Sequence, residues 1–100
     1  MTHAIRIDKE TGPEGGRYVA RIAGVVGEAE ITYTARAPGL ISADHTHAPD
    51  SMRGTGVAMA LVEHMIADAR AGGFRIAPVC PYIQAQYRKH PEWGDVMAAP

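Results

Sequence analysis

The spacing of apolar residues changes once along this chain, and the change falls at a pair of glycines. In the first half, as in residues 18–22 and 29–33, neighbouring positions alternate, which is the period of a β-strand. Over residues 57–71, apolar residues return every three or four positions, which is the period of a helix. The junction reads Arg53-Gly54-Thr55-Gly56-Val57-Ala58. Such a chain must combine a sheet with a helix that begins at these glycines.

The pattern predicts five strands and two helices. The strands expected in the first half cover residues 5–8, 18–23, 28–33 and 40–46, most simply as an antiparallel meander. A fifth strand follows the helix at 74–77, and this crossover makes the fourth and fifth strands parallel. A short helix is expected over 82–89, after Pro81. The expected fold class is α/β (α+β): a mixed, mostly antiparallel sheet with one parallel pair, one long helix and one short C-terminal helix.

Composition limits the class of protein. The 100 residues, 46% of them hydrophobic, are enough for a single domain spanning 1–100. Ten basic and eleven acidic residues offer no ladder of cations for nucleic acid or an anionic membrane, so neither partner is expected. There is one cysteine, Cys80, and no apolar run approaching the roughly 20 residues of a membrane span. We therefore expect a cytoplasmic protein.

The glycine junction has the chemistry of an anion site. The first turn of a helix leaves backbone N–H groups without partners, and glycines let a phosphate approach them closely. A Walker A loop is excluded because no Gly-Lys-Ser/Thr follows, and the dinucleotide fingerprint is excluded because its third glycine is missing. Two interpretations stay open: a single anion nest with one arginine, or a turn that only starts a helix.

The junction also fits the Arg/Gln-x-x-Gly-x-Gly/Ala motif, and with it the chain resembles the GNAT superfamily of N-acetyltransferases. It is similar to the small GNAT-like group related to the human N-acetyltransferase domain-containing protein 1 over roughly residues 15–95. The motifs shared with that group are His45-Thr46, Arg53-Gly54-x-Gly56, Pro78-x-Cys80-x-Tyr82 and His90-Pro91-Glu92-Trp93. The chain departs from the group after His-Thr, where an acidic and then a larger aliphatic residue are usual. Like the group, it lacks the helices that help larger acetyltransferases bind the acceptor.

The resemblance implies that the chain binds acetyl-CoA as acyl donor, and from the residues themselves no metal is expected. In GNAT proteins the fourth and fifth strands splay apart and pantetheine passes between them, while loop amides bind the pyrophosphate. The cofactor-binding residues expected on this basis are Thr46, His47, Ala48, Arg53, Gly54, Thr55, Gly56, Val57 and Ala58. For Arg53, a solvated loop arginine is an equal alternative. The pair of His45 and His47 lacks a third ligand at a defined spacing, which agrees with the absence of a metal site.

Three residues are the candidates for catalysis. Cys80 precedes a predicted helix N-terminus, which stabilises a thiolate, so it is a candidate acyl carrier as well as a small buried hydrophobe. His45 is the candidate general base, with a packed or surface histidine as the alternative, and its neighbour Asp44 is expected to point to the opposite face of the strand. Tyr82, or alternatively Tyr87, is the candidate general acid, each also explicable as a core aromatic residue.

These expectations lead to one function and one rival. The chain is expected to transfer an acetyl group from acetyl-CoA to a primary amine, on a small molecule or a protein lysine. The rival is a CoA-binding or protein-interaction module with little catalysis of its own. The resemblance does not identify the acceptor. A monomer or a weak homodimer is expected.

Overall fold

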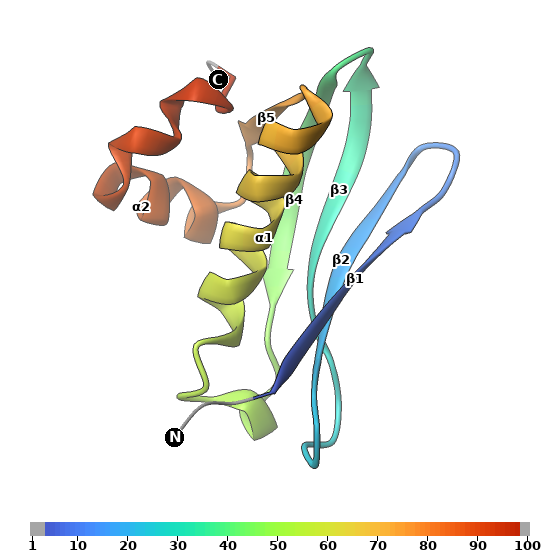
Figure 1. Cartoon of the computed structure of the whole chain (residues 1–100), viewed down its shortest axis with the longest axis vertical. Helices are drawn as coiled ribbons and strands as arrows, with labels where there is room; N and C mark the ends of the chain where they lie inside the picture. The colour runs from blue at the N-terminus through green and yellow to red at the C-terminus, as the bar shows by residue number, and fades with distance from the viewer. Residues whose placement is uncertain (1–3, 99–100) are drawn as a thin grey trace.

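The chain folds as a five-stranded sheet with its helices in the second half of the sequence (Figure 1). This computed structural model describes residues 4–98. The elements are β1 (Ile5–Thr11), β2 (Gly15–Ile22), β3 (Ala29–Ala37), β4 (Leu40–His47), a short 3-10 turn (Asp50–Met52), α1 (Val57–Gly72), β5 (Arg75–Pro78), α2 (Pro81–Lys89) and a second 3-10 turn (Pro91–Asp95). The strands lie in sequence order, antiparallel from β1 to β4, and β5 runs parallel to β4.

The predicted fold class is therefore confirmed, with small shifts in element bounds. β1 extends beyond the expected strand to Thr11, because Thr11 still pairs with Gly16 on β2. β5 covers 75–78 rather than 74–77. α1 lies between two capping glycines, Gly56 before it and Gly73 after it, and both have the positive φ that favours glycine (79° and 72°).

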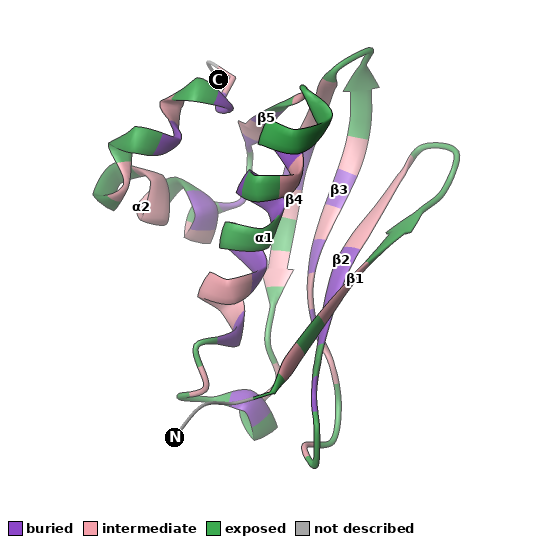
Figure 2. Ribbon diagram, viewed as in Figure 1, coloured by how far each residue is buried: buried purple, intermediate pink, exposed green. Residues whose placement is uncertain are grey.

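One face of the sheet packs on α1, and this is where the core forms (Figure 2). Every second residue of β2, namely Tyr18, Ala20 and Ile22, is buried against the apolar stripe of α1. The buried residues of that stripe are Val57, Leu61, Val62, Met65, Ile66 and Ala69. Trp93 also joins the core and stacks on His90 with ring centroids 4.6 Å apart, which anchors the C-terminal segment.

The other face of the sheet, which we call the open face, carries charged side chains on β1, β2 and β3. Arg17 bonds carboxylates on both neighbouring segments: Glu10 at 2.8 Å, Glu28 at 2.6 Å and Glu30 at 2.8 Å. Arg21 bonds Glu28 at 2.8 Å. No helix within residues 4–98 is both long and apolar enough to cross a membrane.

Candidate functional site

β4 and β5 separate partway along β4. Their pairing ends where Ala43 stands beside Pro78, although β4 continues to His47. Beyond that point the chain turns away, because the N–H groups of Val79 and Cys80 both donate to the carbonyl of Ala43, at 3.1 and 2.9 Å. Within the described chain, the β5-facing edge of β4 thus has no neighbouring strand from Asp44 onward. This confirms the splayed pair that the resemblance implied.

The glycine loop lies between the end of β4 and the start of α1 (Figure 1). Gly54 and Gly56 both have positive φ (77° and 79°), and a Cβ built on either would meet no atom within 4 Å. Among residues 4–98, no acceptor is bonded to the N–H groups of these two glycines, nor to those of Ala58 and Met59 in the first turn of α1. The loop therefore holds four amides without a bonded acceptor in the described chain, at the positive end of the helix dipole.

Side chains around the loop do not block this approach. The first turn of α1 holds no acidic residue. Thr55 turns its hydroxyl back onto the carbonyl of Met52 at 2.6 Å, which fixes the bend of the loop. Arg53 is largely exposed and bonds the equally exposed Asp50 at 2.9 Å. A phosphate at the loop would compete with Asp50 for this guanidinium.

Cys80 sits at the base of the splay. It caps the N-terminus of α2, its residue is 4% exposed, and its Sγ lies 3.3 Å from Thr46 Oγ1 on β4. Tyr82 follows in the first turn of α2. Burial, and then the charge of a Cys80 thiolate, raise the pKa of Tyr82, so its hydroxyl keeps its proton at neutral pH. The structure thus brings together Thr46, Cys80 and the first turn of α2.

His45 and His47 lie elsewhere. In the β3–β4 register His45 stands beside Thr32 and His47 beside Glu30, which places both on the open face, where both are exposed. Thr46 stands beside the buried Ile31 on the helix-covered face. The predicted base His45 and the predicted nucleophile Cys80 are therefore on opposite faces of the sheet.

Asp44 also lies on the open face, which corrects the expectation that Asp44 and His45 point to opposite faces. A register shift between Thr32 and Tyr33 leaves Asp44 as an extra residue on β4. Its carboxylate accepts hydrogen bonds from Thr34 at 2.6 Å and from Ser42 at 2.7 Å. A β-bulge of this kind breaks the alternation of side chains, so two consecutive residues reach the same face.

Asp44 is the polar group that sequence reasoning undervalued. It is the first residue of β4 beyond the paired region, and a small network holds its carboxylate in place. Ser42, only 2% exposed, accepts from Arg36 Nε at 2.8 Å and donates to Asp44, and Arg36 itself lies 3.8 Å from that carboxylate. The signal in the sequence was an acidic residue on the splayed strand; the bulge that orients it was not visible.

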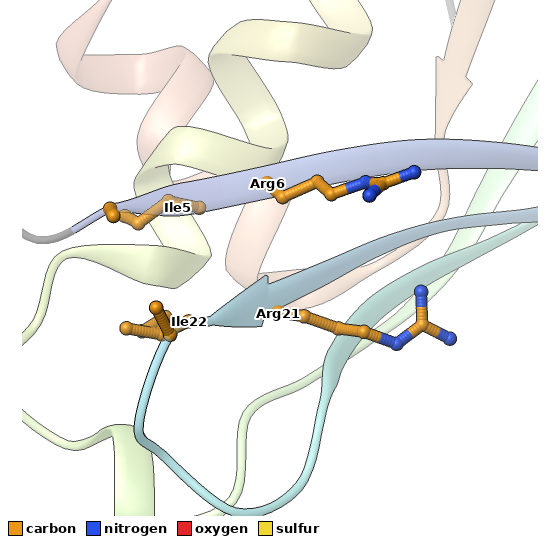
Figure 3. A pocket seen from close by; sticks show the side chains of 6 residues that line it. Ile5, Arg6, Arg21 and Ile22 are labelled. Carbon is orange, nitrogen blue, oxygen red and sulfur yellow. The ribbon is translucent and has the colours of Figure 1, made fainter.

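Two further observations bound the site. Within the described residues no three His, Cys, Asp or Glu side chains are grouped so that they could hold a metal ion. A hollow of about 410 Å³ lies at the end of β1 and β2 (Figure 3). It is lined there by Ile5, Ile22 and the guanidinium-bearing Arg6 and Arg21, and it shares no residue with the glycine loop or the splay.

The comparisons with known proteins agree with this fold. Residues 17–96 match the family described as GCN5-related N-acetyl-transferase. A search among curated proteins found no match. Among solved structures, the chain is similar to the NMR solution structure of a GCN5-like protein from Staphylococcus aureus, with 24% identity and a TM-score of 0.67 over 93% of this chain and 89% of that one. At 24% identity this likeness supports the fold alone.

Proposed function

Because this chain belongs to the family of GCN5-related N-acetyltransferases, we propose that it transfers an acetyl group from acetyl-CoA to a primary amine. The observation that carries the proposal is the pairing of two features along one stretch of chain. These are the free amides of the glycine loop and the open edge of β4 that leads toward it. An anion held at the loop would leave its attached chain beside that edge.

The donor would be bound mainly by backbone. The amides of Gly54, Gly56, Ala58 and Met59 would hold the pyrophosphate, with Arg53 adding charge at the rim. Thr46, His47 and Ala48 would offer main-chain groups to pantetheine, as an added strand does at a sheet edge. Thr55 and Val57 would shape the loop rather than bond the phosphates, because Thr55 Oγ1 is already turned onto Met52. Acetyl-CoA supplies an activated thioester when bound.

In direct transfer, the amine nitrogen attacks the thioester carbonyl carbon, the C–S bond breaks, and the amine loses a proton to a base. Asp44 and His45, both on the open face beyond the splay, are the groups we assign to binding the amine and taking that proton. Tyr82 keeps its proton and is assigned to protonating the leaving thiolate. In a relay, the Cys80 sulfur would attack the thioester carbonyl carbon and release CoA as a thiol, and the amine would then take the acetyl group and free the Cys80 thiol. The burial of Cys80 requires the acetyl group to enter through the splay.

Binding and turnover test the proposal separately. Calorimetry with acetyl-CoA should give saturable binding at micromolar to low millimolar ligand, and its absence at millimolar ligand overturns the proposal. A panel of amines and lysine peptides, read by release of free CoA thiol, should contain at least one acceptor. Intact-mass measurement after incubation with acetyl-CoA distinguishes the routes, since only a relay adds an acetyl group that Cys80→Ala abolishes.

A second function is favoured by one observation. β1 and β2 are joined by only a few residues, without the helices that help larger acetyltransferases bind the acceptor. A CoA-binding or interaction module would bind acetyl-CoA yet release no thiol with any amine. Turnover of one amine at ordinary enzyme rates removes this alternative.

A further inference from the structure

β1 is an edge strand whose outer side is open (Figure 1). Two hydrogen bonds show which residues of β1 point their backbone groups toward β2. The N–H of Ala23 donates to the carbonyl of Ala4 at 3.4 Å, and at the turn the N–H of Gly12 donates to Gly15 at 2.6 Å. Because hydrogen-bonded pairs alternate along an antiparallel ladder, the even-numbered residues of β1 bond to β2. The odd-numbered residues, Ile5, Ile7, Lys9 and Thr11, point their backbone N–H and C=O groups outward.

The opposite edge of the sheet is already covered. Ile76 on β5 donates its N–H to Val96 at 2.8 Å and accepts from Ala98 at 2.8 Å. For β1, no backbone partner of the outward groups occurs among residues 4–98. Among the described residues the outer side of β5 is therefore covered, whereas the outer side of β1 carries a row of donors and acceptors without partners.

β1 also lacks the usual protections of an exposed edge. Natural edge strands carry a bulge, a proline or charged side chains, above all lysine, that disfavour pairing. β1 pairs with β2 regularly over all seven of its residues and contains no proline. Its one lysine, Lys9, is folded onto the helix side, where Nζ lies 2.8 Å from Asp68 Oδ2 and 5.0 Å from the centre of the Phe74 ring. The charge of Lys9 is thereby engaged within the same chain.

Two other charged residues on β1, Arg6 and Asp8, can pair with the same two residues of a second copy. Arg6 and Asp8 lie two residues apart on the open face, with side chains 80% and 40% exposed. Within one chain Arg6 Nε bonds Asp8 Oδ2 at 3.1 Å, and Arg21 lies 3.7 Å from the same carboxylate, so a second copy would exchange the Arg6–Asp8 pairs between the two chains. When two copies of β1 run antiparallel about Ile7, Arg6 of each copy stands beside Asp8 of the other. On the opposite face the two Ile7 side chains meet. Register, charge and apolar contact agree for this one arrangement.

We propose that the β1 edge binds a second copy of this chain, β1 against β1, in antiparallel register centred on Ile7. The outward groups would form three hydrogen-bonded pairs, Ile5 with Lys9, Ile7 with Ile7 and Lys9 with Ile5, and the two sheets would become one. The contact is isologous, so it closes at a dimer. It does not depend on the acetyl transfer proposed above.

The first test removes an outward donor. Ile7→Pro deletes an N–H that β2 does not use, and an edge strand accepts proline at such a position. Sedimentation equilibrium of the full chain should show a concentration-dependent dimer, and Ile7→Pro should raise its dissociation constant at least tenfold. Ile7→Val keeps the donor and should stay near the wild type. Circular dichroism and thermal melting confirm that each variant is folded.

The second test exchanges charges and does not rely on proline. Arg6→Asp makes this edge doubly negative and Asp8→Arg makes it doubly positive, so each variant alone should be mainly monomeric. Mixed in equal amounts, they should form a heterodimer, because every facing pair then has opposite charges. Arg88→Asp and Glu63→Arg carry the same charge changes at exposed sites away from β1, and should each dimerise like the wild type. A wild type that is monomeric at millimolar concentration overturns the proposal, as does a dimer indifferent to all the β1 variants.

Discussion

The hydroxyl of Thr46 lies 3.3 Å from the thiol sulfur of Cys80, across the point where β4 and β5 part. β4 supplies one group and the cap of α2 supplies the other, so the contact joins the two walls of the splay. The buried thiol thus has a polar partner at the place where a thioester would arrive. This pair gives the first prediction about the route of transfer.

Cys80→Ala removes the only thiol of the chain while leaving a small side chain. If transfer is direct, thiol release should persist within about tenfold of the wild type, since neither the donor loop nor Asp44 changes. If Cys80 is the acyl carrier, release should fall by about 10³-fold or more, a loss typical of removing a nucleophile. Thr46→Val removes only the hydroxyl that contacts Cys80 Sγ. If Cys80 is the acyl carrier, intact-mass measurement should still detect the acetyl-enzyme in this variant.

Gly56→Ala tests the anion site without adding bulk to the core. The new methyl would meet no atom within 4 Å, but it must adopt φ near 79° and it stands where a phosphate would approach. The positive φ should cost about 1 kcal/mol of folding stability. Acetyl-CoA affinity should fall at least tenfold, measured by calorimetry.

Gly39→Ala is the control for that substitution. Gly39 also has positive φ, at 75°, with no atom within 4 Å of a built Cβ, but it lies in the turn between β3 and β4. It should lose about the same stability and keep its affinity for acetyl-CoA. Equal losses of affinity in both variants would show that backbone strain, rather than phosphate contact, is being measured.

Asp44→Asn tests the carboxylate at the splay. The amide keeps the shape of the side chain and an oxygen for Thr34 or Ser42, but it loses the charge and the ability to take a proton. Amine turnover should fall by about 10²-fold or more, with acetyl-CoA affinity unchanged. Asp95→Asn, at an exposed carboxylate bonded to Arg70, should leave turnover unchanged. Full activity of Asp44→Asn would leave His45 as the group to examine.

Local sequence patterns predict the fold of this chain but not the orientation of every site residue. The strand order, the crossover and the two ends of α1 follow from local signals: alternation, helical spacing, and glycines with positive φ at positions 56 and 73. The bulge at Asp44 does not, because it is fixed by pairing with β3 rather than by the residues around it. The face on which His45 lies depends on that same pairing register, so it was equally hidden.

Long-range contacts explain another part of what the sequence could not reveal. Lys9 reads as a solvated charge on an alternating strand, yet its ammonium meets Asp68, 59 positions away. The rings of Tyr18, Tyr33 and Phe74 surround it at 5.0 to 5.7 Å from their centres. Such a cation–π environment is assembled only in the folded sheet, because Tyr18 lies on β2, Tyr33 lies on β3 and Phe74 follows α1.

The Lys9–Asp68 contact also makes stability depend on pH. Burial raises the pKa of Asp68, but hydrogen bonds from Lys9 and Tyr18 outweigh it, so the pKa of this carboxyl lies below its ordinary value. The stabilisation is therefore complete above the ordinary carboxyl pKa of about 4, and it is lost as pH falls through the lower folded value. Asp68→Asn should cost about 1 kcal/mol at pH 7, a figure discounted for partial exposure.

Denaturant unfolding at pH 7, 4 and 2.5 measures this dependence. The difference between wild type and Asp68→Asn should shrink steadily toward the lowest pH, because protonation removes from the wild type the charge that the variant already lacks. Asp50→Asn alters a carboxylate whose side chain is 93% exposed, so it should change stability little at any of the three values. A pH-independent difference for Asp68→Asn would mean that Asp68 stabilises α1 and β1 through packing and neutral hydrogen bonds. The charge of Lys9 would then have no measurable part in holding the edge strand on the helix.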